Sequence, residues 1–125
     1  MDTQVHDKAA VQALVDRHFA LWNEADAAQR APLYAGLYTP GIFVADYAGK
    51  AAGYAEVDAK IDAVLGEHPG FAFHPEPATW NHGIGRVTWG YGPAGNPGQV
   101  RGEDIFTIED GKIASLHVFI DPPRA

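Results

Sequence analysis

The sequence of 125 residues contains no cysteine, and this absence excludes several kinds of chemistry. Without thiols the chain has no disulfide framework, no thiolate nucleophile and no sulfur ligand for a metal. Basic residues are also scarce: nine Lys and Arg stand against sixteen Asp and Glu, which gives a net charge of −7. Because binding to phosphates requires clusters of Lys and Arg, we expect no nucleic-acid partner. The same shortage argues against binding to an anionic membrane surface.

Long apolar runs are missing too. No segment reaches the roughly 20 apolar residues that a membrane-spanning helix needs, and the first ten residues, MDTQVHDKAA, are polar and acidic, unlike a signal peptide. We therefore expect no membrane association and take the cytoplasm as the default location. The composition is that of an ordinary globular chain, with 46% hydrophobic and 20% charged residues, and the length suits one domain covering residues 1–125.

Three segments are predicted to be helical. The first covers residues 4–24, where apolar side chains recur every three or four positions. Its stripe consists of Val11, Leu14, Val15, His18, Phe19 and Trp22. A short second helix is predicted from the capping sequence DAAQ (26–29) to a point before TPG (39–41). The third carries an apolar stripe over residues 54–65 and is closed by Gly66.

From Phe71 onward the hydrophobic pattern changes to the period of two that is typical of strands. The chain order is helix, helix, one short strand (42–46), helix, and then four strands. The first of these four, FAFHPEPATW (71–80), holds two prolines, which suit an edge strand or a strand broken by a bulge. This order predicts an α+β fold in which three helices pack on the concave face of a strongly bent antiparallel sheet, with a cavity between the two layers.

One carboxylate interrupts the apolar face of a predicted strand. Alternation in VRGEDIFTI puts Asp104 on the same face as Phe106 and Ile108, where a core strand would place a hydrophobe. Burial disfavours the charged form of such an acid, and a neutral carboxyl can donate a hydrogen bond to an oxyanion. The alternative is a structural acid that is hydrogen-bonded to Trp89 or Arg86. We expect Asp104 to line a pocket.

Two further residues are candidates for catalysis. Asp46 ends the strand predicted over 42–46, where an acid at the mouth of a pocket can stay ionised and take a proton. Paired acids in unlike environments can act as base and acid, which makes Asp46 and Asp104 together a stronger candidate than either alone. The alternative role of Asp46 is to cap the following loop. His18, in the middle of the first helical stripe, is either a core residue with one hydrogen bond or a third catalytic group.

Aromatic and polar side chains on neighbouring elements are candidates for binding a substrate. They are Phe19, Trp22, His82, Arg86, Trp89, Phe106, His117 and Phe119. The sequence leaves open whether His82 and His117 face the pocket or the outside. No pair of histidines has the spacing of a metal site, and the glycine-rich GYGPAGNPG joins two strands rather than a strand and a helix. We expect neither a metal nor a cofactor.

The element order, the length and the closing pattern GEDIFTIEDGKI…FID resemble the nuclear transport factor two-like superfamily, which includes ketosteroid isomerases and SnoaL-like polyketide cyclases. The resemblance extends from HFALWNEAD (18–26) to HVFID (117–121). It is strongest to small bacterial SnoaL-like proteins, in which the pattern of His82, Arg86 and Trp89 recurs with a Gly-x-Asp before the last hairpin and a terminal Phe-x-Asp. It implies a cystatin-like cone with the order α-α-β-α-β-β-β-β.

The resemblance also implies roles for particular residues. Asp46 resembles the general base of the ketosteroid isomerases, and Asp104 resembles their protonated aspartate, which donates a hydrogen bond to the developing oxyanion. The isomerases place a tyrosine on their first helix as the main oxyanion donor, whereas this chain has His18 or Trp22 on the corresponding stripe.

The sequence thus predicts a cofactor-independent isomerase or cyclase that moves a proton on a small apolar carbonyl compound. Asp46 would take the proton while Asp104, helped by His18, stabilises the enolate. The alternatives are a non-catalytic protein that binds a hydrophobic ligand and a dimeric interaction module. Apolar residues on both faces of the last strands also predict a homodimer through the outer sheet face. They are Leu116, Val118 and Ile120 on one face and Ile113 and Phe119 on the other.

Overall fold

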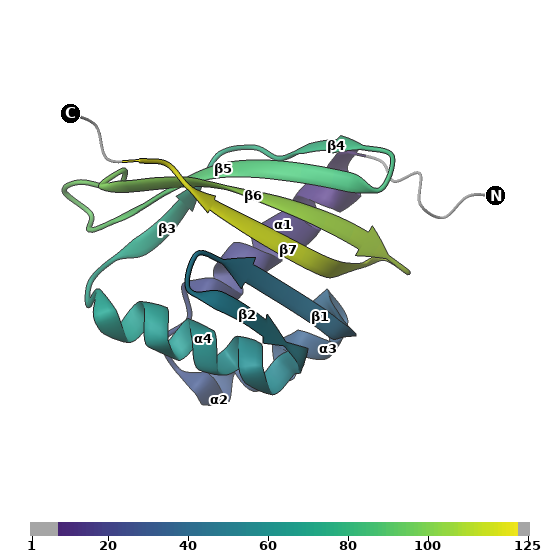
Figure 1. Ribbon diagram of the computed structural model, residues 1–125, viewed down its shortest axis with the longest axis horizontal. Coiled ribbons are helices and arrows are strands. Elements are labelled where there is room, and N and C mark those ends of the chain that lie inside the picture. Colours follow the sequence, from purple (N-terminus) through teal and green to yellow (C-terminus); the bar gives the residue numbers. More distant parts are fainter. Residues whose placement is uncertain (1–7, 123–125) are drawn as a thin grey trace.

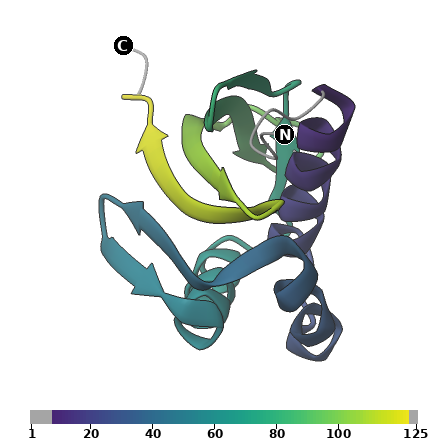
Figure 2. The ribbon, with the colours of Figure 1, turned by 90° about the vertical axis from the view of Figure 1, so that its right-hand side faces the viewer.

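The computed structural model describes residues 8–122 and shows one bent sheet with helices along it. The helical segments are α1 (Lys8–Trp22), α2 (Ala27–Arg30), the 3₁₀ turn η1 (Ala31–Leu33), α3 (Tyr34–Leu37) and α4 (Gly53–Glu67). The strands are β1 (Tyr38–Asp46), β2 (Gly49–Ala52), β3 (Ala72–Pro75), β4 (Thr79–Asn81), β5 (Ile84–Gly92), β6 (Val100–Glu109) and β7 (Lys112–Ile120). Helix α4 packs against β1 and β2, and α1 packs against β3 and β4, so the two long helices flank the bent sheet (Figures 1 and 2).

The strand order is β2-β1-β7-β6-β5-β3, and β4 pairs with β5 beside β3. The α+β class and the bent sheet agree with the sequence prediction, but the sheet is mixed rather than wholly antiparallel, because β1 runs parallel to β7. These two strands lie far apart in the chain, so no hairpin sets their relative direction. The alternation of apolar residues reports which face is buried and carries no information on strand direction.

The helices differ from the prediction at their ends. Helix α1 ends at Trp22, because the side chain of the next residue, Asn23, forms two hydrogen bonds with the backbone of Phe73. The predicted start at residue 4 lies outside the described residues. Asp26 caps α2 by accepting a hydrogen bond from the Ala28 N–H, as predicted. The second helix is nevertheless broken into three short pieces, with Pro32 in the 3₁₀ turn, where its missing N–H does no harm.

Strand β1 is longer than predicted, since it begins at Tyr38 rather than Ile42. Strand β2 was not predicted at all, because its sequence GKAA lacks the branched and aromatic residues that favour strands. The segment 71–80 splits into β3 and β4, both antiparallel to β5, as two prolines there suggested. In β6, alternate residues from Gly102 to Ile108 are buried, which confirms the predicted position of Asp104 on the inner face.

A bulge near the start of β7 changes one part of the prediction. Thr107 pairs with Ser115 and Ile108 pairs with Ile113, so Ala114 is an extra residue on β7. The bulge turns Ile113 into the core, where it is fully buried. Ile113 therefore does not belong to the outer face, contrary to the alternation read from the sequence.

A buried arginine fixes helix α4 in place. The Arg30 side chain is wholly buried, and its guanidinium donates to the Asp58 carboxylate, to Asp62 and to the Glu24 carbonyl. The hydrogen bond from Arg30 lowers the pKa of Asp58, and the hydrogen bond to Asp58 is the main cause that raises the pKa of Arg30. Tyr34 also donates to Asp58. The cluster thus ties α2 and α3 to α4, the helix that covers the cavity.

Candidate functional site

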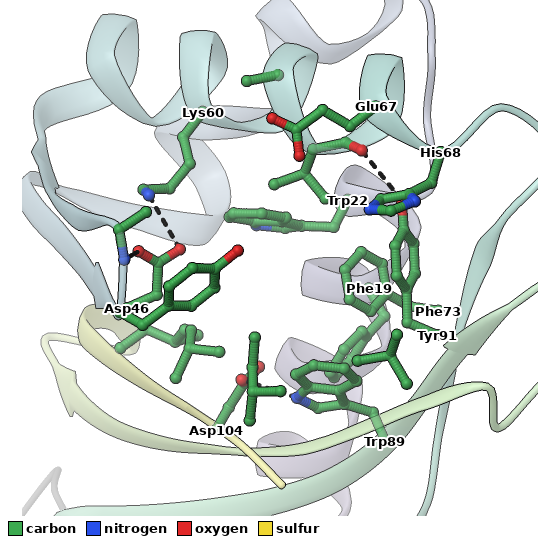
Figure 3. A pocket seen from close by; sticks show the side chains of 18 of the residues that line it. Phe19, Trp22, Asp46, Lys60, Glu67, His68, Phe73, Trp89, Tyr91 and Asp104 are labelled. Carbon is green, nitrogen blue, oxygen red and sulfur yellow. Dashed lines mark hydrogen bonds and ion pairs between the residues drawn. The ribbon is translucent and has the colours of Figure 1, made fainter. Parts of the chain in front are cut away.

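A cavity of about 620 Å³ lies between α1, α4 and the concave face of the sheet (Figure 3). Its volume falls within the range of roughly 300–1,000 Å³ that is typical of small-molecule sites. One wall is aromatic and is formed by Phe19, Trp22, Phe73, Trp89 and Tyr91. The rings of Phe73 and Tyr91 are stacked with their centroids 4.2 Å apart, and Trp89 meets Phe73 edge-on at 5.3 Å. This mutual packing gives the wall a fixed shape.

Both aspartates identified from the sequence line this cavity. Asp104 pairs with Val118 across β6 and β7, and Asp46 follows Ala45, which pairs with His117 across β1 and β7. Asp46, Val118 and Asp104 thus form a row across three neighbouring strands. Two strand spacings separate the backbones of the two acids, which is about 10 Å. The cavity therefore has two separate polar sites, one at Asp104 and one at Asp46, rather than one pair of neighbouring acids. Figure 3 shows them on different walls.

Asp104 lies on the cavity floor and is 3% exposed. One of its carboxylate oxygens, Oδ1, accepts a hydrogen bond of 2.8 Å from the indole Nε1 of Trp89. The other, Oδ2, lies 3.5 Å from Nε2 of His18, which is also 3% exposed. The structural alternative of a bond to Trp89 is thus present in the structure. It occupies one oxygen and leaves the other beside His18.

On the side of the imidazole opposite Asp104, the Nδ1 of His18 lies within hydrogen-bond distance of the Tyr38 hydroxyl. The indole of Trp22 can only donate, so the Tyr38 oxygen accepts in their 3.1 Å contact and the Tyr38 proton is free to donate to Nδ1. Burial raises the pKa of Tyr38 well above its ordinary range, which keeps this hydroxyl protonated. When Tyr38 donates to Nδ1, a neutral His18 carries its proton on Nε2, the atom that faces Asp104.

Tyr38 was not among the candidate residues predicted from the sequence. Its position could have been inferred, because Tyr38 shares the alternation of Ile42, Val44 and Asp46 once the strand is extended four residues toward the N-terminus. The TPG sequence at residues 39–41 suggested a turn instead, although the structure accommodates it inside the exposed part of β1.

Asp46 forms the second polar site together with Lys60. Both side chains are largely buried. The ammonium of Lys60 donates to Oδ2 of Asp46 at 2.9 Å, and the N–H of Ala48 donates to Oδ1 at 2.9 Å. The side chains of Lys60 and Asp46 are 15% and 13% exposed. Asp46 thus caps the turn that follows β1, which was the alternative to catalysis, and it also forms an ion pair on the cavity wall.

Lys60 was not among the candidate residues predicted from the sequence, although its helical spacing could have identified it. It lies three residues after Val57 and four before Val64, so helical spacing puts it on the face of α4 that turns toward the sheet. A charged residue beside an apolar stripe is usually interpreted as lying at the solvent-exposed edge of that stripe. Here the stripe covers a cavity rather than a packed core, and the ammonium reaches into it.

Five of the residues predicted to bind substrate lie outside the cavity. Phe106 is in the core, stacked on Trp80, because the bent sheet packs that end of β6 under β4. His82 is exposed in the turn between β4 and β5, where its φ is positive. Arg86, His117 and Phe119 have the parity of the outer sheet face and are exposed there. Of the predicted binding residues, Phe19, Trp22 and Trp89 do line the cavity.

Within residues 8–122 no group of three or more His, Asp or Glu side chains is arranged to hold a metal ion. No helix in this part of the chain is long and apolar enough to cross a membrane. Every buried polar side-chain atom described by the structure has a hydrogen-bond partner.

Many solved structures resemble the fold, and three of them illustrate the range. A candidate isomerase of the SnoaL-like family from Agrobacterium tumefaciens is 20% identical, with 91% of this chain and 99% of the other covered and a TM-score of 0.83. A protein of unknown function with a cystatin-like fold from Methylobium petroleophilum is 17% identical, with 95% and 80% covered and a TM-score of 0.74. A candidate polyketide cyclase from Sinorhizobium meliloti is 18% identical, with 90% and 99% covered and a TM-score of 0.68.

At these identities the solved structures show the fold, which confirms the cystatin-like cone implied by the resemblance seen in the sequence. No curated protein matches the sequence. A family model described as the SnoaL-like domain matches residues 15–116, which extend from α1 into β7. The chain therefore belongs to the SnoaL-like domain family.

Proposed function

We propose that the protein is a cofactor-independent enzyme that binds a small, largely apolar carbonyl compound and moves a proton on it, as an isomerase or a cyclase does. The observation that carries this proposal is the His18–Asp104 pair on the floor of an aromatic cavity. Two titratable side chains, each 3% exposed and each held by a separate hydrogen bond, are poised to act together. The candidate isomerase and the candidate polyketide cyclase among the similar structures support the same class of reaction.

The geometry suggests how the two side chains divide the work. Oδ2 of ionised Asp104 takes a proton from the carbon beside the substrate carbonyl, and the electron pair of that C–H bond moves into the enolate. The Nε2–H of His18 donates a hydrogen bond to the enolate oxygen, where the negative charge develops. Asp104 then returns the proton to a different carbon. In a cyclase the enolate carbon instead forms a bond to a second carbonyl carbon, the electron pair of that C=O bond moves to its oxygen, and Asp104 gives this oxygen the proton. Trp89 and Tyr38 keep both groups oriented throughout.

This assignment differs from the one suggested by resemblance to the isomerases, in which Asp46 is the base. Both oxygens of Asp46 already accept hydrogen bonds, one of them from the ammonium of Lys60. To take a proton, Asp46 would have to give up the Lys60 contact inside the protein, where an ion pair is costly to break. Oδ2 of Asp104 carries no such tie, because its 3.5 Å separation from His18 exceeds an ordinary hydrogen bond.

The exchange of hydrogen for deuterium next to a ketone tests this proposal without knowledge of the natural substrate. We suggest 2-tetralone, a two-ring ketone with acidic protons beside its carbonyl, followed by NMR in D₂O. The protein should accelerate the exchange, and Asp104→Asn, which keeps the shape but removes the base, should lower the acceleration by roughly a hundredfold. Asp110→Asn, at an exposed turn between β6 and β7, is the matched control and should retain the wild-type rate.

Two results would count against the proposal. An exchange rate that survives Asp104→Asn would remove Asp104 from the reaction. Binding of 2-tetralone without any acceleration would favour the second candidate, a binding protein of the same fold for hydrophobic ligands, which the aromatic wall also suits.

A further inference from the structure

The Lys60–Asp46 pair lines a part of the cavity that has no role in the proposed proton transfer at Asp104. Lys60 reaches the cavity from α4, the helix that covers it, and Asp46 reaches it from the end of β1 (Figure 3). The pair is set apart from Asp104 by the width of β7, about 10 Å between the strands that carry the two acids. A ligand whose carbonyl lies at Asp104 would therefore bring a different atom to Lys60.

Lys60 carries more donors than its ion pair with Asp46 uses. Its ammonium has three N–H donors, and one hydrogen bond joins it to Asp46. The Lys60 side chain is 15% exposed and lines the cavity. An oxygen atom of a ligand in the cavity can therefore accept a hydrogen bond from Lys60 without breaking the ion pair.

The charges around the pair limit which oxygen this can be. Asp46 already balances the charge of Lys60. Glu67 and Asp121 also line the cavity, and their carboxylates repel an anion that enters it. A carboxylate or phosphate group on the ligand is therefore disfavoured, whereas a hydroxyl or carbonyl oxygen meets the Lys60 donors without adding charge.

We infer that Lys60 and Asp46 form a second polar subsite, which binds an uncharged hydroxyl or carbonyl oxygen at the end of the substrate remote from the reacting carbonyl. Lys60 donates to this oxygen, and a ligand hydroxyl can donate in turn to Asp46. The aromatic wall of Phe73, Trp89 and Tyr91 packs on the apolar rings between the two oxygens. The ligand is thus an uncharged molecule with an apolar body and an oxygen at each end. This inference rests on the proposed function, because it places the reacting carbonyl at Asp104.

A matched pair of ketones tests the subsite. 2-Tetralone and 6-hydroxy-2-tetralone differ by one hydroxyl at the ring corner opposite the carbonyl, and calorimetry can compare their affinities for the full-length protein. Because a hydrogen bond to a charged donor contributes about a tenfold gain in affinity, the wild-type protein should bind the hydroxy compound about tenfold more tightly. In Lys60→Met this preference should fall to near one. In Lys50→Met, which changes an exposed lysine on β2, it should persist.

Removing Lys60 alone leaves Asp46 without its counter-charge, and the variant can fail to fold. The double variant Asp46→Asn with Lys60→Met removes both charges, keeps an oxygen to accept from the Ala48 N–H, and should also lose the preference. A 6-carboxylate analogue of the same ketone should bind the wild-type protein more weakly than the hydroxy compound does.

The outcomes separate this inference from the proposed function. Equal affinity of the wild-type protein for both ketones, or a preference that survives the loss of Lys60, overturns the subsite and leaves proton transfer at Asp104 intact. Tighter binding of the carboxylate than of the hydroxy compound overturns the uncharged class of ligand. If neither ketone binds, the proposed function fails and the subsite fails with it.

Discussion

The indole of Trp89, on β5, crosses over Gly102 of the neighbouring strand β6 and donates a hydrogen bond to Asp104. Trp89 pairs with Gly102 in the register of β5 and β6, and Nε1 lies 2.8 Å from Oδ1 of Asp104, two residues further along β6. A Cβ at Gly102 would collide with the six-membered ring of Trp89. The spacing Gly-x-Asp therefore has a physical basis: the glycine provides the space for the ring that orients the acid.

Replacing this glycine should disturb both stability and the site. In Gly102→Ala the new methyl group must displace Trp89, and overpacking of this kind costs about 1–3 kcal/mol in the free energy of unfolding. The displaced indole should also lose its bond to Asp104, so the rate of deuterium exchange in 2-tetralone should fall. Chemical denaturation and NMR measure the two effects.

Gly95→Ala is the control for this change, because a Cβ at Gly95 meets no atom within 4 Å. It should leave both stability and exchange near their wild-type values. If Gly102→Ala proved as harmless as Gly95→Ala, then Trp89 would not depend on the glycine for its position.

The hydroxyl of Tyr38 should be as important as the residues that line the cavity, although Tyr38 does not touch it. Tyr38→Phe leaves the Nδ1 of His18 and the indole N–H of Trp22 without their shared partner. Unsatisfied buried groups cost about 1–3 kcal/mol each, so the free energy of unfolding should drop by at least that amount. The control Tyr47→Phe, at a tyrosine that is 84% exposed, should change it little.

The same variant should change the tautomer of His18. Without the Tyr38 hydroxyl, Nδ1 loses its hydrogen-bond partner, and the imidazole signals in NMR spectra should shift toward a mixture of tautomers. An unchanged tautomer in Tyr38→Phe would show that Asp104 alone determines it.

Arg30 should contribute stability that depends on pH. Because the hydrogen bond from Arg30 lowers the pKa of Asp58, the folded state favours the ionised carboxylate. This contribution is fully present above the pKa of Asp58 in the unfolded chain, about 4. It is lost as the pH falls through the lower pKa of the folded state. Arg30→Met should thus destabilise the protein by about 3 kcal/mol at neutral pH, and the deficit should shrink below about pH 4.

Urea denaturation at pH 7 and at pH 3 can measure this dependence. Lys50→Met is the control, because Lys50 is exposed on β2 and its loss should cost within about 0.5 kcal/mol at either pH. A deficit for Arg30→Met that stays constant with pH would mean that its packing, rather than its bond to Asp58, accounts for its effect.

Much of the fold could be predicted from the sequence, because burial follows the periods of helices and strands. Local structure was predicted correctly from the apolar stripe on α1, from the alternation in β6 and from the two prolines at residues 75 and 77. The parallel pairing of β1 with β7 and the bulge at Ala114 were not predictable in this way, since they depend on how distant strands meet. A one-residue bulge was enough to move Ile113 from the outer face to the core.

The candidate site was predicted in part, for a related reason. Asp104 and His18 interrupt apolar patterns, and that anomaly led to them without any knowledge of the third dimension. Lys60 and Tyr38 fit their surroundings in the sequence and became visible only when the ion pair with Asp46 and the bond to His18 were seen. Arg86, His117 and Phe119 were candidates for binding because polar and aromatic residues suit a binding site, yet their parity puts them on the opposite face.

That opposite face leads to the last prediction. We propose that the protein forms a homodimer through the outer face of the sheet, as its apolar residues first suggested. Phe119 and Ile84 remain 59% and 54% exposed there, and the helices cover only the other side. Phe119→Glu should turn a dimer into a monomer in light scattering at micromolar concentration, because it places a charge in an interface that would exclude water. Leu33→Glu, which changes an exposed leucine on η1, should leave the dimer intact. A wild-type protein that is already a monomer at this concentration would contradict the prediction.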